Sequence, residues 1–247
     1  MTYQIDAPAP GATGSEGNAK PNALNNTMPT NLQQYVADDH GAADQLVPDE
    51  GAALAHLEML FGRAVNDGLI EIAWTPAGNP QRGPSAARLF DVTDVEDAAA
   101  FACEVNAIEG QNVYVGMALR QPGTFPGARA SDADFMAVWA LAADCDDKAA
   151  SDRAKEYMRG QDLRPSAYVV TGSLPASVGM RAQLWFSLTD PITDPATFRD
   201  MQARLAHHLG GDPSIKNPSR IMRLAGSIAW PAKPGRVIER TEWHVSV

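Results

Sequence analysis

The sequence predicts one folded domain in which helices and strands are interspersed, preceded by an unstructured leader. The chain has 247 residues, 45% of them hydrophobic, which is enough for one sizeable core. Beyond residue 47, apolar residues at helical spacing are interspersed with short β-type segments bounded by glycine and proline. Residues 1–47 are rich in Pro, Gly, Ala and Asn and have no sustained apolar period, so they are predicted to be disordered. The folded domain is therefore expected to span residues 48–247.

The first half of this domain is expected to begin with an amphipathic helix. Asp49 is a suitable cap, and Ala53, Leu57 and Leu60 form one apolar stripe that ends before Gly68. Strands are expected at 69–75, 88–92 and 113–120. Thr93 and Glu96 have the spacing of a capping box, which predicts a helix running to about Gly110.

The second half continues with an apolar strand that ends in acidic residues. We expect, in order, a short helix from Ser131, a strand ending at Asp144, a helix over 149–159, strands at 167–171 and 182–188, a helix from Asp194 to Gly210, a short helix capped by Asn217 and a strand at 237–245.

Charge and missing motifs exclude several classes of protein. The net charge of −10 argues against a protein that coats nucleic acid non-specifically, because such binding depends on lysine and arginine. Residues 201–247 nevertheless carry seven basic against three acidic residues, so a phosphate-binding surface is expected there. No P-loop motif occurs, and neither a membrane span nor a secretion signal is found, so a cytoplasmic protein is expected.

Three aspartates are candidates for a metal site. Asp144 and Asp146 are alternate residues at a strand end and should project together; two such carboxylates stay ionised in a semi-buried site only with a cation between them. Magnesium or manganese suits these all-oxygen ligands. Asp212, held in a rigid segment between Gly211 and Pro213, is a third candidate. A solvated strand end and a simple turn aspartate are the alternative interpretations.

The segment from Asp212 to Lys233 resembles a signature of the archaeo-eukaryotic primase superfamily, in its RepB-like plasmid and phage primase-polymerases (PrimPol). That signature has Gly-Asp, then Arg-hydrophobic-hydrophobic-Arg-Leu-Pro-Gly-Thr and a later lysine. Here Ala225 replaces the proline and Ser227 the threonine. With the Asp144-Cys145-Asp146 strand, the resemblance covers about residues 50–240.

The resemblance implies an α+β fold: a primase-like palm with an RRM-like sheet and a smaller N-terminal α/β lobe. It implies template-dependent nucleotidyl transfer, as a DNA primase or polymerase of phage or plasmid replication, with Asp144, Asp146 and Asp212 binding two Mg²⁺ or Mn²⁺ ions. The implied partners are single-stranded DNA, nucleoside triphosphates and a replicative helicase, fused or encoded nearby. The residues expected to bind the nucleotide are Ser173, Arg181, Gln183, Arg220, Arg223 and Lys233.

One departure from the family pattern bears on activity. Gln183 stands where the family commonly has a histidine that contacts the nucleotide's phosphates, although a glutamine amide can also donate to phosphate. An inactive primase-fold module that binds nucleic acid or initiates replication is therefore the main alternative, and a metal-dependent nuclease a weaker one. Arg120 is either a further phosphate ligand or a strand-end surface charge.

Overall fold

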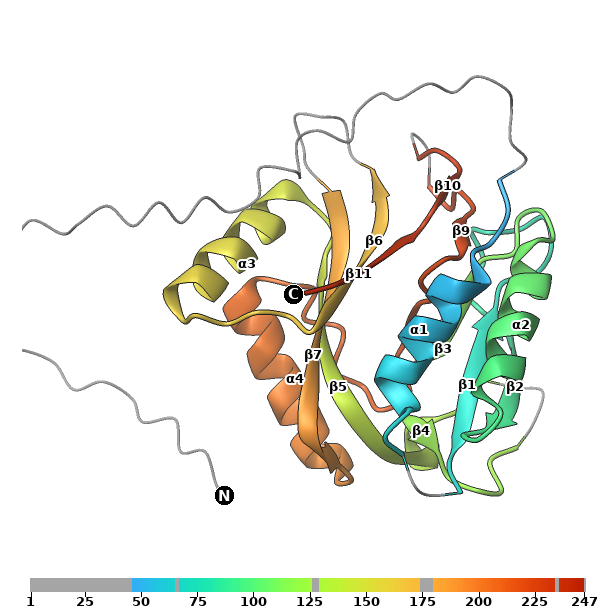
Figure 1. Ribbon diagram of the computed structural model, residues 1–247, viewed down its shortest axis with the longest axis horizontal. Coiled ribbons are helices and arrows are strands. Elements are labelled where there is room, and N and C mark those ends of the chain that lie inside the picture. Colours follow the sequence, from blue (N-terminus) through green and yellow to red (C-terminus); the bar gives the residue numbers. More distant parts are fainter. Residues whose placement is uncertain (1–45, 65–66, 126–128, 174–179, 234–235, 247) are drawn as a thin grey trace, which may run out of the picture. The chain divides into compact units, whose positions relative to one another are not determined.

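A computed structural model of the protein (Figure 1) describes residues 46–64, 67–125, 129–173, 180–233 and 236–246. The predicted leader, residues 1–47, lies outside the described residues except for its last two positions. Residues Gln45–Val247 form one structural unit.

The N-terminal half of this unit packs two helices on a small antiparallel sheet. Strand β1 (Leu69–Trp74) pairs with β2 (Ala86–Asp91), β3 (Val113–Gly116) and β4 (Leu119–Arg120), so the single strand predicted at 113–120 is divided in two. Helices α1 (Glu50–Phe61) and α2 (Val95–Asn106) pack on each other, and α2 lies on β1.

Both of these helices form where the sequence predicts them, but their ends differ. The carboxylate of Asp49 caps α1 by accepting from the Ala52 amide at 3.0 Å. The helix ends at Phe61 and not at Gly68, because the Gly62 amide closes the last turn on the Glu58 carbonyl. The capping box proposed for Thr93 does not form, since α2 starts after Asp94 and the Thr93 hydroxyl donates to the Asp94 carboxylate.

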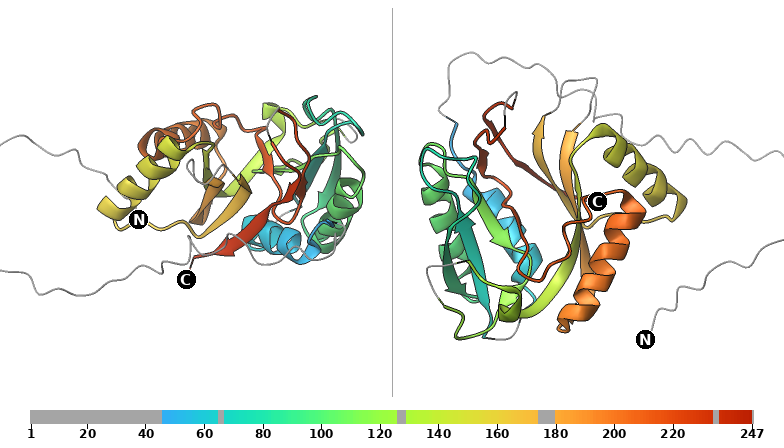
Figure 2. Two further views of the ribbon diagram at one scale, coloured as in Figure 1. Left: turned by 90° about the horizontal axis from the view of Figure 1, so that it is seen from above. Right: turned by 180° about the vertical axis from the view of Figure 1, so that it is seen from behind.

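The C-terminal half is built on the longest strands. Strand β5 (Phe135–Cys145) follows a 3₁₀ turn, η2 (Asp132–Asp134), and pairs with β7 (Met180–Ile192); β7 pairs with β6 (Ala167–Ser173), and β6 pairs with β11 (Glu242–Val245). Helices α3 (Lys148–Gly160) and α4 (Pro195–Leu209) pack on β5 and β7 (Figure 2).

The two halves share one sheet with the strand order β11-β6-β7-β5-β4-β1-β3-β8, to which β2 adds beside β1. After α4 the chain returns to the N-terminal half, where β8 (Ile221–Arg223) pairs with β3. The prediction of a short helix after Asn217 is therefore wrong, because residues 221–223 form a strand. Strands β9 (Ile228–Ala229) and β10 (Glu239–Arg240) form a separate ribbon.

The core lies on both faces of the C-terminal strands. Ala143 and Cys145 pack with Leu209 beneath α3 and α4. Because side chains alternate along a strand, Asp144 points to the opposite face of β5. On that face Trp185 of β7 is fully buried and makes an edge contact with His56 of α1. This face therefore belongs partly to the core and partly to the cleft described next.

Candidate active site

A cleft of about 370 Å³ opens between the two halves of the sheet. One wall comes from β3 and β8 and the other from β5, β6 and β7. Seven of the nine residues singled out from the sequence line it: Asp144, Asp146, Arg181, Gln183, Arg220, Arg223 and Lys233. The structure thus brings together side chains from positions 144 to 233 in one cleft.

The segment after α4 places Asp212 against the end of β5. Gly210 ends the helix with a left-handed backbone (φ 68°), a conformation that glycine adopts without strain. The chain then passes so close to β5 that a Cβ on Gly211 would lie 3.2 Å from the Asp144 carbonyl oxygen. The Asp212 amide donates to this same carbonyl at 3.1 Å. Asp212 does not line the cleft itself but lies beside the residue that does.

The pKa of Asp144 depends on its burial and on the two neighbouring aspartates. Burial, followed by the charges of Asp146 and Asp212, raises the pKa of Asp144 from 3.8 to about 7. Burial also opposes ionisation of Asp212, but hydrogen bonds from Ser214 to both of its oxygens outweigh burial and lower the pKa of Asp212. In the described ranges, no group of three or more His, Cys, Asp and Glu side chains is arranged so that it could hold a metal ion.

Arg181 lines the cleft with a buried side chain, and only part of its hydrogen-bonding capacity is used. Its Nη2 pairs with Glu239 of β10 at 3.2 Å, and its Nε has no hydrogen-bond partner within the described residues. The side chain reaches Glu239 across Gly172, where a Cβ would meet Nη2 at 1.9 Å. Gly172 therefore leaves the space in which the Arg181–Glu239 pair sits.

Two arginines reach the cleft from around β8: Arg220 directly precedes this strand, and Arg223 is its last residue. Arg220 donates to the Ser214 hydroxyl at 2.9 Å and lies 3.4 Å from an Asp212 oxygen. Arg223 donates to Asn112 at 2.7 Å, and its guanidinium lies 5.1 Å from the centre of the Tyr114 ring. Both guanidiniums act to lower the pKa of Asp144, so they belong to the same electrostatic environment as the aspartates.

Gln183 joins two strands at the cleft, whereas Ser173 is described by its backbone alone. With its amide oriented to satisfy both polar atoms, Gln183 donates to the Arg223 carbonyl at 3.2 Å and accepts from the Arg223 amide at 3.3 Å. It therefore ties β7 to β8, while still lining the cleft. The backbone of Ser173 pairs with Met180 at the end of β6, but its side chain lies outside the described residues.

Tyr114 and Arg129 are among the lining residues that sequence reasoning missed, and the side chain of Arg120 was misjudged. Tyr114 lines the cleft from β3, where it is partly exposed between buried neighbours, and no sequence motif marks its role. Arg129 lines the cleft from a loop without any periodic pattern, so no signal marks it. Arg120 is neither of the alternatives considered, because its side chain is fully buried and paired with Glu71 at 2.6 Å.

Solved structures with the same fold were found, at low sequence identity. The primase-polymerase (PrimPol) AEP domain of cyanophage S-2L matches with a TM-score of 0.52 and 22% identity, over 81% of this chain and 92% of that one. The primase RepB′ matches with a TM-score of 0.51 and 16% identity, over 78% of this chain and 56% of that one. No protein-family model and no curated protein matched the sequence.

The chain has an α+β archaeo-eukaryotic primase fold, of the kind found in RepB-like primase-polymerases. This agrees with the fold class expected from the sequence. Across the described part of the chain, none of the helices combines the length and apolar character needed to cross a bilayer.

Proposed function

We propose that this chain is a template-dependent nucleotidyltransferase, a DNA primase or DNA polymerase that extends a strand from nucleoside triphosphates. One observation carries the proposal: two carboxylates, Asp144 and Asp146, line the same cleft as four predicted cationic residues. Carboxylates bind divalent cations, and guanidiniums bind phosphate oxygens bidentately. Nucleotidyl transfer needs both groups beside one another. The fold shared with primase-polymerases is consistent with this chemistry but does not by itself establish it.

Divalent ions fit the acidic side of the cleft. The donors are all carboxylate oxygens, which suits magnesium or manganese. The negative charges of Asp146 and Asp212 repel that of Asp144 and help to raise its pKa. A bound cation would relieve this repulsion. Asp144 and Asp146, the two carboxylates that line the cleft, would hold the ions; within the described residues no third His, Cys, Asp or Glu side chain is placed to join them. When bound, two such ions supply activation of the attacking hydroxyl and stabilisation of the leaving pyrophosphate.

The cationic side chains would bind and orient the triphosphate. Arg181 has an Nε without a partner, and Arg220 likewise has a buried Nε that makes no hydrogen bond to the described residues. Lys233 is exposed at the cleft and would contact either the triphosphate or the template strand. The two arginines are held by Glu239, Ser214 and Asp212 before substrate arrives, so they need little reorganisation when charge develops.

A non-catalytic module that binds single-stranded DNA is the second candidate, and Gln183 is the observation that favours it. Both polar atoms of its amide are used by the Arg223 backbone. The amide can therefore contact phosphate only by giving up a hydrogen bond between β7 and β8. If turnover depends on a phosphate donor at this position, the protein would bind nucleic acid without extending it.

Strand synthesis with labelled nucleotides on a single-stranded template, with and without a primer, tests the proposal. Wild type is expected to form product only with magnesium or manganese, and Asp144→Ala combined with Asp146→Ala is expected to reduce incorporation by at least 100-fold, an order of magnitude typical of lost transition-state stabilisation. Circular dichroism should show the same fold for both proteins. Full activity in the double variant would place the site elsewhere, and a folded, DNA-binding wild type without product would favour the non-catalytic module.

A further inference from the structure

A buried carboxylate organises the wall of the cleft opposite the aspartates. Glu71 of β1 is fully buried and accepts from four donors. Its Oε2 accepts from Nε and Nη2 of Arg120 at 2.9 and 2.6 Å, and its Oε1 accepts from the Ala130 amide at 2.9 Å and from Nε of Arg129 at 3.4 Å. One side chain of the central strand therefore holds both arginines in place.

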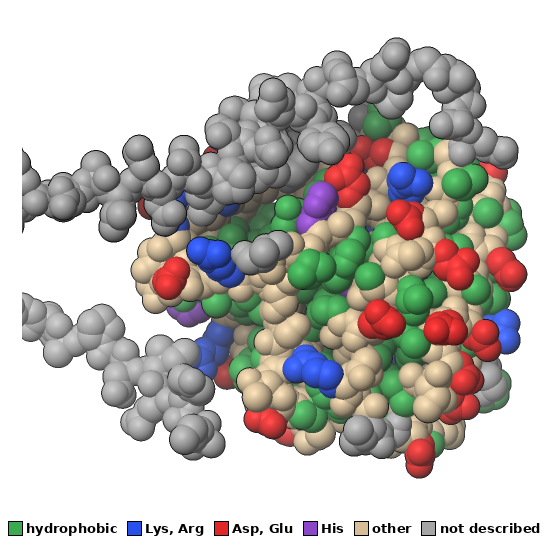
Figure 3. Space-filling view, in the orientation of Figure 1, with side chains coloured by type: hydrophobic (Ala, Val, Ile, Leu, Met, Phe, Trp, Pro, Cys, Tyr) green, Lys and Arg blue, Asp and Glu red, His purple; other side chains and the backbone are tan. Residues whose placement is uncertain are grey.

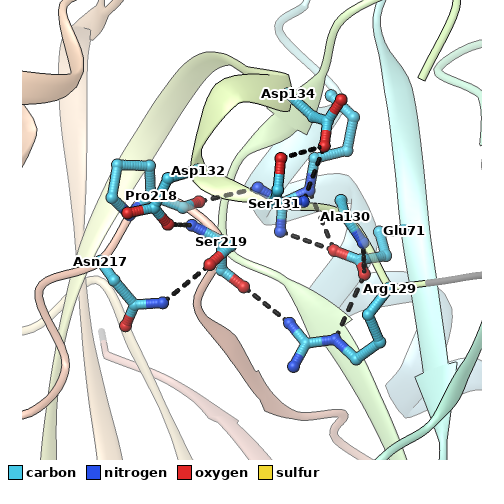
Figure 4. A network of polar contacts seen from close by, with 10 residues as sticks. Glu71, Arg129, Ala130, Ser131, Asp132, Asp134, Asn217, Pro218 and Ser219 are labelled. Carbon is cyan, nitrogen blue, oxygen red and sulfur yellow. Dashed lines mark hydrogen bonds and ion pairs between the residues drawn. The ribbon is translucent and has the colours of Figure 1, made fainter. Parts of the chain in front are cut away.

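The two arginines hold consecutive carbonyls of the segment that leads into the cleft. Arg120 donates to the Pro218 carbonyl at 2.7 Å, and Arg129 donates to the Ser219 carbonyl at 2.7 Å. The Ser219 amide donates in turn to Asp132 at 2.9 Å, so both backbone groups of this residue are fixed. Figure 4 shows Arg129 reaching from its loop to Ser219 with Glu71 on its other side. The next residue along the chain is Arg220.

Arg129 differs from Arg120 in facing the cleft. The Arg120 side chain is fully buried, whereas that of Arg129 is 29% exposed and lines the same cleft as Asp144 and Arg181. Arg129 uses Nε and Nη2 within the network, and its Nη1 makes no hydrogen bond to the described residues. The network thus fixes one edge of the guanidinium and leaves donors for a ligand.

Charge balance points to an anionic ligand. The single negative charge of Glu71 faces two guanidiniums, and its closest contacts go to Arg120. Arg129 therefore shares Glu71 with Arg120 and meets it at the longer distance of 3.4 Å, on the cleft surface. A planar guanidinium held in this way is suited to phosphate oxygens, and little side-chain freedom is lost on binding.

We propose that Arg129 is a phosphate-binding residue of the cleft and that Glu71 is the positioning residue that fixes it, together with the 218–219 segment before Arg220. This inference rests on the proposed function for the identity of the ligand: a phosphate group, carried either by a nucleoside triphosphate or by the backbone of single-stranded DNA. Because Arg129 lines the same cleft as Asp144, the triphosphate is the favoured ligand.

Two binding titrations with purified protein test the role of Arg129. One uses a nucleoside triphosphate with calcium and no DNA, and the other uses a single-stranded oligonucleotide and no nucleotide. Arg129→Gln is expected to weaken binding about tenfold in at least one titration, because it removes a charge-assisted contact. Arg129→Lys should recover only part of this loss, since it lacks the fork geometry. Arg204→Gln, which removes an exposed charge on α4, is the matched control.

The outcome also identifies the ligand. A loss in the triphosphate titration assigns Arg129 to the nucleotide, and a loss with DNA alone assigns it to the strand backbone. If Arg129→Gln matches Arg204→Gln in both titrations, the proposal for Arg129 is wrong. These are binding measurements, so an inactive wild type would count against nucleotidyl transfer without affecting the result for Arg129. Conversely, an active enzyme insensitive to Arg129→Gln would overturn this inference alone.

A double-mutant cycle of Glu71 and Arg129 tests whether Glu71 acts by positioning Arg129. Glu71→Gln keeps the size of the side chain and removes its charge, but it leaves Arg120 buried without a counter-charge and can lower stability for that reason alone. The double variant with Arg129→Gln separates the two effects. If Glu71 acts through Arg129, Glu71→Gln weakens phosphate binding in the wild-type background and much less when Arg129 is absent. Equal losses in both backgrounds would show a general structural effect and overturn the positioning role.

Discussion

At the scale of single residues, packing decides which charged side chains in the cleft can still bind a ligand. Gly172 has no side chain where a Cβ would overlap the Arg181 guanidinium and the Glu239 carboxylate, which it would meet at 1.9 and 2.3 Å. The ion pair therefore forms close against the backbone of β6, and the arginine stays within the cleft wall. A buried arginine with one paired and one unpaired nitrogen suits a site that receives an anion.

Asp144 should make stability depend on pH in metal-free buffer. Its pKa is about 7 in the folded protein and near its ordinary 3.8 in the unfolded chain, so the folded state holds the proton more tightly. Stability should fall as pH rises from about 4 through about 7. Asp144→Asn removes this penalty, so it should be more stable than wild type above pH 7, by at most about 4 kcal/mol, and equally stable near pH 4. Urea unfolding at several pH values with a chelator measures this difference; a constant gap at all pH values would contradict it.

The sequence predicts the acidic and basic residues of the site better than their surroundings. Asp144 and Asp146 are recognisable because two acids end an apolar strand, and Arg220 and Arg223 because they match a family signature. Arg129 comes from an irregular loop and reaches the cleft only through tertiary contacts with Glu71 and Ser219. Such contacts between distant segments leave no local pattern in the sequence.

Element-scale contacts explain how β5 keeps its acidic end in place. Beyond its contacts with β4, the edge of β5 away from β7 is bonded to α4 and to the segment after it, not to another strand. The fully buried Gln202 of α4 accepts from the Ala142 amide at 3.2 Å and donates to the Ala142 carbonyl. Two residues further along β5, the Asp144 carbonyl accepts from the Asp212 amide. Together these contacts satisfy backbone groups that would otherwise be buried without partners.

Replacing Gln202 should therefore weaken the fold more than the chemistry. Gln202→Leu removes both hydrogen bonds to Ala142 and leaves the backbone amide and carbonyl of Ala142 buried without these partners. This loss should lower the free energy of unfolding by about 2–4 kcal/mol. Gln202 does not line the cleft, so triphosphate affinity at a temperature where the variant is folded should stay within about twofold of wild type. Thermal unfolding and the triphosphate titration measure the two quantities, and an unchanged stability would show that these bonds contribute little.

Elements with strong local signals follow the sequence, whereas a segment with a weak local signal can be overruled by long-range pairing. Helix α4 begins after Asp194, with Pro195 in its first turn, and ends at Gly210, as its capping residues predict. The segment over 217–223 carries a helix-like start, yet residues 221–223 form β8 because they pair with β3 more than a hundred positions away. Backbone pairing with a distant strand overrides a weak local preference.

At the scale of the whole molecule, the net charge of −10 is unevenly distributed. Helices α1 and α2 carry no lysine or arginine, and Figure 3 shows carboxylates across the part of the surface that they form. The exposed acids on these helices are Glu50, Glu58, Glu96, Asp97 and Glu104. The cationic side chains that line the cleft are Arg129, Arg181, Arg220, Arg223, Lys233 and Arg236. An acidic protein can therefore still present a basic surface to phosphates.

This separation of charge predicts how binding to single-stranded DNA depends on salt. If the cleft neutralises three to five backbone phosphates, the logarithm of the association constant should fall with the logarithm of salt concentration with a slope of about −2 to −4, since each neutralised phosphate contributes about −0.7 for single strands. Replacing Arg223 and Lys233 by glutamine should make the slope shallower by about one unit.

Fluorescence anisotropy of a labelled oligonucleotide between about 50 and 200 mM salt, a range over which such contacts lose most of their affinity, measures these slopes. Glu96→Gln with Asp97→Asn, on the acidic surface of α2, is the matched control and should shift the affinity slightly without changing the slope. A wild-type slope near zero would mean that the cleft does not bind the strand backbone. In that case the six cations would act on the triphosphate alone, and the template would have to bind through another surface of the domain.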